Sequence, residues 1–349
     1  MTGLAARRAP VSGGGGSCVE IAAVVAALAA GLGACGGPYP QSAVHPASDM
    51  AVKLDDLFDQ ILWWAAGVFV VVQGILFYTL FRFREKQARR RPREFHGHTL
   101  LEIGWTLVPA LILVAIAVPT IRVIFEVDRP TTDENALVVE VEARRWWWEF
   151  SYPEYDLVTA NEMHIPVGRT IDVRMRSADV LHSFWVPRLG GKRDVVPGRE
   201  NHIWFKADST GVFLGQCAEF CGVAHALMGF RVIVQDPSEF QEWVGASLLD
   251  APRPTSADGR AGAGVFATSA CVGCHTVRGV ATAQQGFGPD LTHFGSRLTI
   301  GAGILENNVD NLVTWLDSTQ HVKPGALMPE VEMSEEQLRQ LARFLLEMR

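Results

Sequence analysis

The chain lacks both an excess of positive charge and the cysteine content of a disulfide-rich protein. Its net charge of −7 gives no reason to expect nucleic-acid binding. Only six of its 349 residues are cysteines, and four of these form two close pairs, Cys217/Cys221 and Cys271/Cys274. Such spacing is typical of metal or cofactor attachment and does not indicate a disulfide framework. The length favours more than one domain.

Charged residues are also missing from two long apolar stretches. Residues 60–81 and 103–121 contain no Asp, Glu, Lys or Arg. As a helix, each stretch covers roughly 30 Å, the thickness of a hydrocarbon core. Pro109 and Pro119 fall in the second stretch, but membrane helices tolerate proline. We therefore predict a transmembrane hairpin over residues 50–126, with helices at about 60–81 and 103–121.

The segment between these stretches is strongly basic and predicts the orientation of the hairpin. Residues 82–93 contain seven Lys or Arg residues, and short basic loops stay in the cytoplasm. Everything after about residue 125 is therefore expected on the outer side of a bacterial cell membrane, in a multi-pass protein.

The N-terminal segment predicts the same orientation. Arg7 and Arg8 precede a 12-residue apolar run, and Leu32–Cys35 resembles a bacterial lipoprotein cleavage site. We predict a signal peptide over residues 1–34, with Cys35 as a lipidated first residue of the mature chain.

Residues from about 135 to 235 show the patterns of β-strands. Ile171, Val173 and Met175 alternate with polar residues, which is the period of a half-buried strand. Further short strands are expected at 137–141, 203–205, 212–214 and 230–234. Several short strands with Gly and Pro between them predict a sandwich or small barrel, which we place at residues 127–247.

Soft metal ligands gather near the end of this β domain. Cys217, Cys221, His225 and Met228 fall within twelve residues, and His182 lies 35 residues before Cys217. A blue-copper site uses one Cys, two His and a weak axial Met, so this set has one thiolate more. Two bridging thiolates suit two copper ions, each keeping one His, with Met228 and a backbone carbonyl completing the two shells.

A disulfide and a zinc site are the alternative interpretations of these residues. Outside the cytoplasm, a Cys-x-x-x-Cys pair alone is more often a disulfide. Zinc would use the Cys and His side chains but leave the Met unused. The complete set favours copper.

A second cofactor signature follows a predicted linker at residues 248–261, which is rich in Ala, Pro and polar residues. Cys271-Val-Gly-Cys274-His275 is the Cys-x-x-Cys-His signature of c-type haem attachment. The two thiols add to the haem vinyl groups, and His275 becomes an axial iron ligand. The second axial ligand is commonly Met; we prefer Met328, and Met333 is the alternative.

The residues around this signature are expected to be helical, which disfavours a thioredoxin-like redox pair. Leu312, Trp315 and Leu316 share one helical face, and Ser334–Gln337 is a capping box. We therefore predict an all-α domain over residues 262–349.

Residues from about 50 to 245 resemble subunit II of the haem-copper cytochrome c oxidases. The resemblance rests on Asp179–Ser183, Val196–Arg199 and Gly215–Met228. It implies a cupredoxin-like domain that carries the binuclear copper centre CuA. The implied ligands are His182, Cys217, the backbone carbonyl of Glu219, Cys221, His225 and Met228.

The same resemblance implies three further roles. The Glu219 side chain would face a magnesium site shared with the catalytic subunit. Trp146, in the Arg145–Trp148 run, would receive electrons, although a Trp cluster can also be an interfacial belt. Glu102 would lie at the mouth of a proton path.

The C-terminal part resembles a fused cytochrome c domain, with Gly288–Leu291 similar to the haem-edge loop of that family. The whole chain then resembles a subunit of a respiratory, proton-translocating cytochrome c oxidase. Electrons would pass from an external cytochrome or a quinol–cytochrome reductase complex to haem c, then to CuA and the oxygen-reducing catalytic subunit. Other oxidase subunits and membrane lipid are further expected partners. The alternatives are a CuA and haem c component of a nitrogen-oxide reductase, and a copper-delivery protein with a thioredoxin-like fold.

Overall fold

The computed structural model describes residues 39–84, 97–283 and 287–349. The chain divides into two compact units, Met1–Pro40 and Gln41–Arg349, and the fold below is that of the second unit. The predicted signal peptide, Cys35 and most of the basic loop lie outside the described residues.

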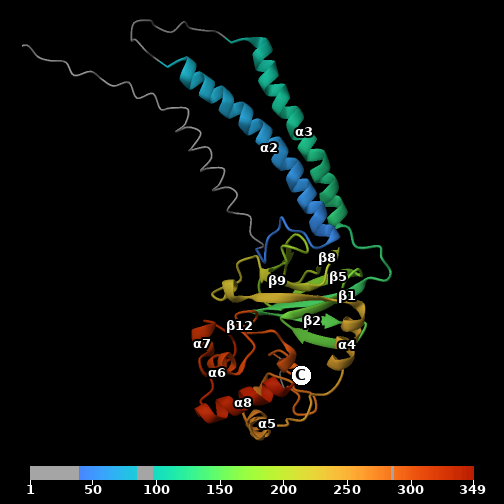
Figure 1. Cartoon of the computed structure of the whole chain (residues 1–349), viewed down its shortest axis with the longest axis vertical. Helices are drawn as coiled ribbons and strands as arrows, with labels where there is room; N and C mark the ends of the chain where they lie inside the picture. The colour runs from blue at the N-terminus through green and yellow to red at the C-terminus, as the bar shows by residue number, and fades with distance from the viewer. Residues whose placement is uncertain (1–38, 85–96, 284–286) are drawn as a thin grey trace, which may run out of the picture. The chain divides into compact units, whose positions relative to one another are not determined.

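Two long apolar helices form the predicted hairpin (Figure 1). Helix α2 spans Asp49–Arg82 and helix α3 spans Thr99–Asp128, and both are long and apolar enough to cross a membrane. Both extend beyond the uncharged stretches. Helix α2 begins after Ser48 because the Ser48 side chain accepts a hydrogen bond from the Ala51 amide. The cap, and not the hydropathy, therefore sets where this helix begins.

The first turn of α2 is anchored in the β domain. Ser48 Oγ donates to the Leu189 carbonyl at 2.7 Å, and Asp49 Oδ1 accepts from the Lys206 amide at 2.8 Å. Met50 is also buried. These contacts fix the point at which the hairpin leaves the β domain.

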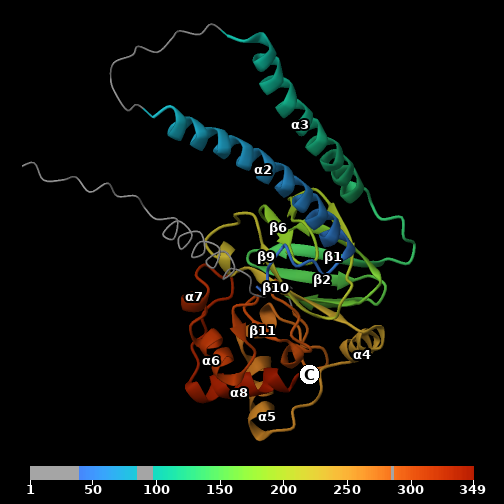
Figure 2. The same ribbon diagram turned by 45° about the horizontal axis from the view of Figure 1, so that its top comes forward.

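Ten strands of the described residues form two five-stranded sheets (Figure 2). The strand orders are β3-β2-β1-β5-β8 and β4-β10-β9-β6-β7. The bounds are β1 Leu137–Arg144, β2 Trp147–Tyr152, β3 Leu157–Ala160, β4 Glu162–Pro166, β5 Thr170–Ser177, β6 His182–Trp185, β7 Arg193–Val195, β8 Asn201–Lys206, β9 Gly211–Cys217 and β10 Gly229–Gln235. All five predicted strands lie within these elements, and the sandwich prediction is confirmed.

Alternating burial along the strands builds one aromatic core between the sheets. Strands β2 and β10 bury every second residue, as the two-residue period of a strand requires. Trp148 and Phe230 meet with ring centroids 5.2 Å apart, and Phe184 stacks on Phe230 at 4.7 Å. This core lies directly beneath the ends of β6 and β9, where the predicted copper ligands begin.

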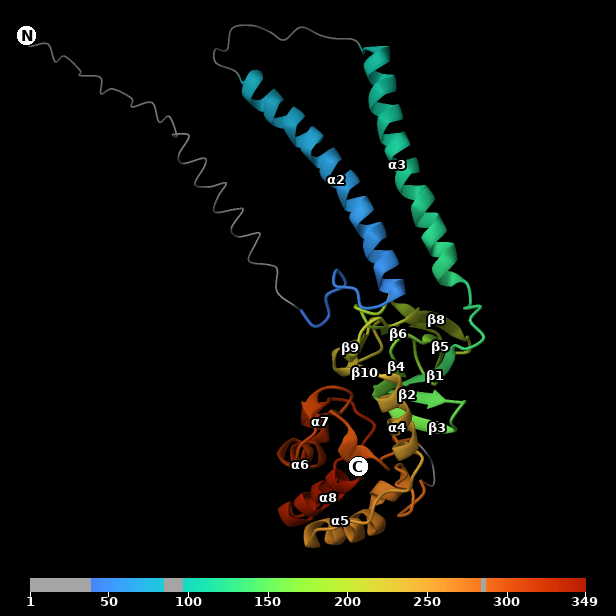
Figure 3. The same cartoon turned by 45° about the vertical axis from the view of Figure 1, so that its right-hand side comes forward.

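The C-terminal part is a small helical domain (Figure 3). Helix α4, Pro237–Ser247, packs against β4 and β10 before it. The domain itself contains α5 Ala257–Thr268, α6 Val309–Asp317, α7 Thr319–Val322 and α8 Glu335–Glu347, with the short helices η2 Ala270–Gly273 and η3 Phe294–Ser296. The predicted capping box opens α8. A ladder of β11 Thr299–Ile300 and β12 Leu305–Glu306 is the one non-helical element in its described residues.

Helices α5 and α8 pack closely because a glycine faces the partner backbone. A Cβ atom at Gly262 would lie 2.0 Å from the Gln340 carbonyl oxygen. Gly264, in the same helix, has open space where its Cβ would be. Phe266 and Phe344 fill the adjoining core, with ring centroids 5.6 Å apart. The helical domain therefore depends on a small residue at position 262.

We predict opposite effects of alanine at these two glycines. Gly262→Ala pushes the helices apart and should lower the free energy of unfolding by about 1–3 kcal/mol. Gly264→Ala only restricts the unfolded chain and should raise it by roughly 0.5–1 kcal/mol. Urea unfolding of the helical domain in the full-length protein, followed by haem absorbance, measures both. Equal effects of the two substitutions would contradict the close packing of α5 on α8.

Candidate copper and haem centres

The predicted copper ligands come from two neighbouring strand ends and the loop between β9 and β10. His182 is the first residue of β6, and Cys217 is the last residue of β9. Cys221 lies in the following loop, His225 opens the short helix η1 (His225–Leu227), and Met228 precedes β10. The loop is closed by a hydrogen bond from the Cys217 amide to the Met228 carbonyl at 2.9 Å. Adjacent strands therefore hold both ends of the ligand loop.

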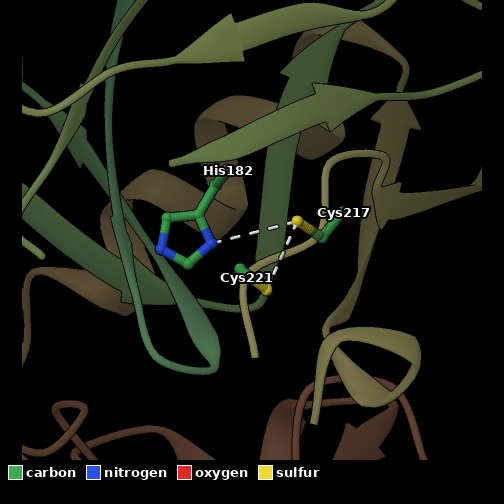
Figure 4. Close-up of side chains that lie close together, drawn as sticks. All are labelled: His182, Cys217 and Cys221. Carbon is green, nitrogen blue, oxygen red and sulfur yellow. Dashed lines mark hydrogen bonds between the residues drawn. The ribbon is translucent and has the colours of Figure 1, made fainter. Parts of the chain in front are cut away.

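The structure brings all six predicted ligand groups together, as Figure 4 shows for three of them. The two cysteine sulfurs lie 3.8 Å apart, which is contact distance and not a covalent bond. The other groups surround this pair: His182 Nδ1 lies 3.9 Å and the Glu219 carbonyl oxygen 3.2 Å from Cys217 Sγ, and His225 Nδ1 lies 3.6 Å and Met228 Sδ 3.9 Å from Cys221 Sγ.

Water is largely excluded from four of the six ligand residues, whereas His225 and Glu219 are half-buried. His182 is fully buried, and Cys217, Cys221 and Met228 are between 1% and 6% exposed. The edge of the Trp148 ring packs against the His182 ring from the core side, at a centroid distance of 6.1 Å. A dry and rigid ligand shell changes little when its charge changes, which suits electron transfer.

The two thiols do not ionise alike. Contact with Cys221, with further hydrogen bonds from the His182 ring and backbone groups, outweighs burial and lowers the pKa of the Cys217 thiol well below its ordinary value. The neighbouring Cys217 thiolate raises the pKa of Cys221 above its ordinary value. Two adjacent thiolates repel each other, so the second ionises only when cations join the pair. The donor set therefore fits soft cations held between the sulfurs.

Asp179 orients the imidazole of His182. Its Oδ1 lies 2.8 Å from His182 Nε2, and because a carboxylate only accepts, that nitrogen carries the proton. Nδ1 then presents its lone pair to the cluster, as metal-bound histidines require. Burial raises the pKa of Asp179, but hydrogen bonds from His182 and from the Arg145 and Val180 amides outweigh it and lower the pKa.

Trp146, the predicted electron-entry residue, contacts the ligand loop directly. Its Nε1 donates to the Cys221 carbonyl at 3.0 Å. The side chain is only 7% exposed, so it does not form an interfacial aromatic belt. Its indole lies against Gly222, where a Cβ atom would come within 3.0 Å of the ring.

The predicted haem residues line one apolar cavity in the helical domain. The cavity is lined by Cys271, Cys274, His275 and Met328, and also by Trp146 of the β domain. Met328 and Met333 both pack against the hydrophobic core of the domain, but Met333 is not among the residues that line the cavity. The cavity thus brings both attachment thiols and two potential iron ligands to the same space.

His275 is held in the tautomer that an iron ligand needs. Its Nδ1 lies 2.8 Å from the Pro289 carbonyl oxygen, which only accepts, so Nδ1 carries the proton and Nε2 keeps a free lone pair. Burial lowers the pKa of this ring and favours its neutral form. A Cβ at Gly288 would lie 2.6 Å from the ring, so glycine is needed there.

Glu102 lies far from both clusters, and Glu219 contributes its carbonyl to one of them. Glu102 is exposed in the first turn of α3, a helix of 30 residues that leads into the β domain. At about 1.5 Å per residue, roughly 40 Å of helix separates it from that domain. The proton-path role of Glu102 and a magnesium site at the half-buried Glu219 side chain remain predictions.

Sequence reasoning gave no role to several residues that shape these sites. Asp179 lies in the Asp179–Ser183 motif, and its position three residues before His182 is the available signal. Pro289 lies in the Gly288–Leu291 motif. Glu162 and Lys323, both buried, had no recognisable pattern in the sequence.

Three family models match successive parts of the chain. They describe the transmembrane domain of cytochrome c oxidase subunit II at residues 39–123, the periplasmic domain of the same subunit at residues 155–235, and cytochrome c at residues 259–349. The subunit II models imply a membrane anchor, a periplasmic domain and a copper centre, and the cytochrome c model implies a haem.

Named relatives match over nearly the whole length. Cytochrome c oxidase subunit 2 of Alkalihalophilus pseudofirmus is 39% identical over 320 residues, covering 90% of this chain and 92% of the relative. The corresponding protein of Bacillus subtilis is 33% identical over 314 residues, covering 85% and 88%. The crystal structure of the periplasmic domain of subunit II of cytochrome oxidase from Bradyrhizobium japonicum is 34% identical, covers 34% of this chain and 96% of that one, and has a TM-score of 0.32. The chain therefore belongs to the cytochrome c oxidase subunit II family of oxidoreductase-complex subunits and carries a cytochrome c domain at its C-terminal end.

Proposed function

We propose that this chain passes single electrons from an external donor, through a covalent haem c and a binuclear CuA centre, to the catalytic subunit of a respiratory oxidase. The observation that carries the proposal is the placement of Trp146, which contacts the copper-ligand loop and also lines the haem cavity. The bound haem iron and copper pair would supply one-electron redox chemistry, and the residues described below would hold and orient them. Oxygen reduction and proton translocation belong to the catalytic subunit.

The β domain would hold the two copper ions. Cys217 and Cys221 would bridge them, because the two sulfurs already face each other at 3.8 Å. His182 and His225 would bind one ion each, and Met228 and the Glu219 carbonyl would serve as weak donors. Burial of most of this set supports rapid electron transfer, since little solvent has to reorganise around it.

The helical domain would attach and orient the haem. Cys271 and Cys274 would form the two thioether bonds, and His275 Nε2 would bind the iron, supported by the Pro289 carbonyl behind the ring. Met328 would be the second axial ligand because it lines the cavity. The fused domain keeps the donor at high effective concentration beside the copper centre.

The membrane hairpin would place both centres on the outer side of a bacterial cell membrane, in a multi-pass topology. The basic loop between the helices would stay in the cytoplasm. The catalytic subunit and other oxidase subunits would contact the hairpin. Glu102 would open a proton path there, and the Glu219 carboxylate would bind a shared magnesium ion. The donor would be a cytochrome or a quinol–cytochrome reductase complex.

The copper-delivery alternative predicted a thioredoxin-like fold without a Met ligand. The two five-stranded sheets and the buried Met228 beside Cys221 argue against it. A nitrogen-oxide reductase component would differ from the proposed oxidase subunit only in its catalytic partner. Copurification with an oxygen-reducing subunit therefore distinguishes the two hypotheses.

We predict that the copper pair is an obligatory step after the haem. In the purified oxidase, stopped-flow reduction should fill haem c first and the copper centre second. In the double variant Cys217→Ser/Cys221→Ser, the external donor should still reduce haem c at the wild-type rate. Reoxidation of the haem by oxygen should fall by about 100-fold or more, because neither bridging thiolate remains.

The exposed Ser209→Ala serves as the control for that experiment and should change neither rate. Wild-type reoxidation of haem c in the double variant, with no copper bound, would contradict the proposed order of transfer.

We also predict that Met328, and not Met333, is the second iron ligand. Met328→Leu removes the thioether from the haem cavity, so the visible spectrum should lose the signature of Met ligation and the haem potential should fall. Met333→Leu keeps a similar volume in the core and should leave both unchanged. Visible absorption with a redox titration measures the pair, and the reverse pattern would assign the ligand to Met333.

A further inference from the structure

A buried lysine joins the helical domain to the β domain. Lys323 follows α7 and is 3% exposed, and it is the one fully buried lysine among the described residues. Its Nζ donates to the Trp146 carbonyl at 2.6 Å and to the Gly301 carbonyl at 2.8 Å. One ammonium therefore bridges a carbonyl of the β domain and a carbonyl of the helical domain.

A buried glutamate makes the reciprocal contact. Glu162 opens β4 and is 2% exposed. Its Oε1 accepts from the Leu298 amide at 2.7 Å and from the Thr299 amide at 3.2 Å. Each domain thus contributes one charged side chain that is satisfied by the backbone of the other.

A left-handed turn lies between these two contacts. Gly301, Ala302 and Gly303 all have positive φ angles, from 67° to 86°. The Ala302 carbonyl accepts from the Gly229 amide at 2.9 Å, and the Gly303 carbonyl accepts from Arg231 Nη2 at 3.3 Å. This turn therefore meets the start of β10 in a defined register.

The interface also encloses the Trp146 indole. A Cβ at Gly222, in the copper-ligand loop, would come within 3.0 Å of the ring, and a Cβ at Gly325, in the helical domain, within 3.2 Å. The ring is held between these two glycines and is 7% exposed. The helical domain thus covers the surface through which a soluble donor would reach Trp146.

We propose that Lys323 and Glu162 are positioning residues that lock the helical domain in one docked position over Trp146. Taking charged groups out of water is costly unless each finds its partners, and only this register satisfies both. Lys323 and Glu162 therefore determine which docked position forms, and they contribute less to the stability of the interface. A helical domain locked over Trp146 leaves the haem as the point of entry for electrons from an external donor. That consequence rests on the proposed function, but the locking itself does not.

Burial lowers the pKa of Lys323 to about 7. The neutral amine and the ammonium both carry enough N–H groups to donate to the two carbonyls, so the contact does not depend on which form is present. The register is set by the contacts themselves: Lys323 Nζ has two carbonyl acceptors, and the Glu162 carboxylate accepts from two amides.

Chemical labelling of lysine tests the lock in the full-length, haem-loaded protein in detergent. An amine-reactive acetyl ester followed by mass spectrometry reports each lysine separately, and the exposed Lys192 is the internal reference. We expect Lys323 to react at least about tenfold more slowly than Lys192, because the reagent reaches a buried amine only when the interface opens locally. Glu162→Ala leaves the Leu298 and Thr299 amides without their acceptor. The rate of Lys323 acetylation should therefore rise about tenfold, while that of Lys192 stays unchanged. Reaction of Lys323 at the Lys192 rate in the wild-type protein would overturn the proposal.

A second variant tests the same proposal if the Glu162→Ala protein does not fold. Lys323→Met has similar length and no donor, and Lys192→Met is its matched control. Hydrogen exchange at residues 298–303 should rise about tenfold in Lys323→Met alone, while exchange in the core of α8 stays slow. Unchanged exchange at 298–303 would refute the role of Lys323, and faster exchange in α8 as well would show a structural role only. Neither readout needs copper or electron flow, so a negative result leaves the electron-transfer proposal untouched.

Discussion

Two cysteine sulfurs held 3.8 Å apart in a dry loop are the constraint on which the rest of this molecule depends. The loop keeps its shape because strands hold both of its ends. Cys217 ends β9, and its amide is bonded to the Met228 carbonyl next to β10. The aromatic core beneath, from Trp148 to Phe230, resists collapse of the site. The β-sandwich therefore holds the two cysteines in a fixed arrangement.

The β-sandwich also determines where the two cofactor sites lie relative to each other. Trp146 lies in the turn between β1 and β2, where its Nε1 bonds the ligand loop and its carbonyl accepts from Lys323 of the helical domain. One residue thus contacts the copper loop, the haem cavity and the domain interface. A tethered donor gains most when its docked position is unique. The reciprocal contacts of Lys323 and Glu162 meet that requirement with two side chains.

Much of this arrangement was predictable from local patterns in the sequence. Uncharged stretches, strand alternation, the Cys-x-x-Cys-His signature and the clustered soft ligands each depend on residues close in the chain, and the hairpin, the sandwich and the ligand cluster follow from them. The bounds of α2 were not predictable from hydropathy, because Ser48 sets its start. Nor were Asp179, Glu162 and Lys323 assigned a role, since their partners are side chains and carbonyls brought near by folding. The domain interface joins residues such as Trp146 and Lys323, which are 177 positions apart, and no periodicity reports such a contact.

The central claim is that one electron is shared by two copper ions between Cys217 and Cys221. It is tested most directly by metal analysis and electron paramagnetic resonance of the full-length chain, isolated in detergent with copper and haem bound. The account predicts two copper ions per haem iron and a hyperfine pattern from two equivalent copper nuclei. One copper ion with the hyperfine pattern of a single nucleus, zinc in its place, or a Cys217–Cys221 disulfide in the haem-loaded protein would contradict it. The chain would then be a membrane-anchored cytochrome without the copper relay.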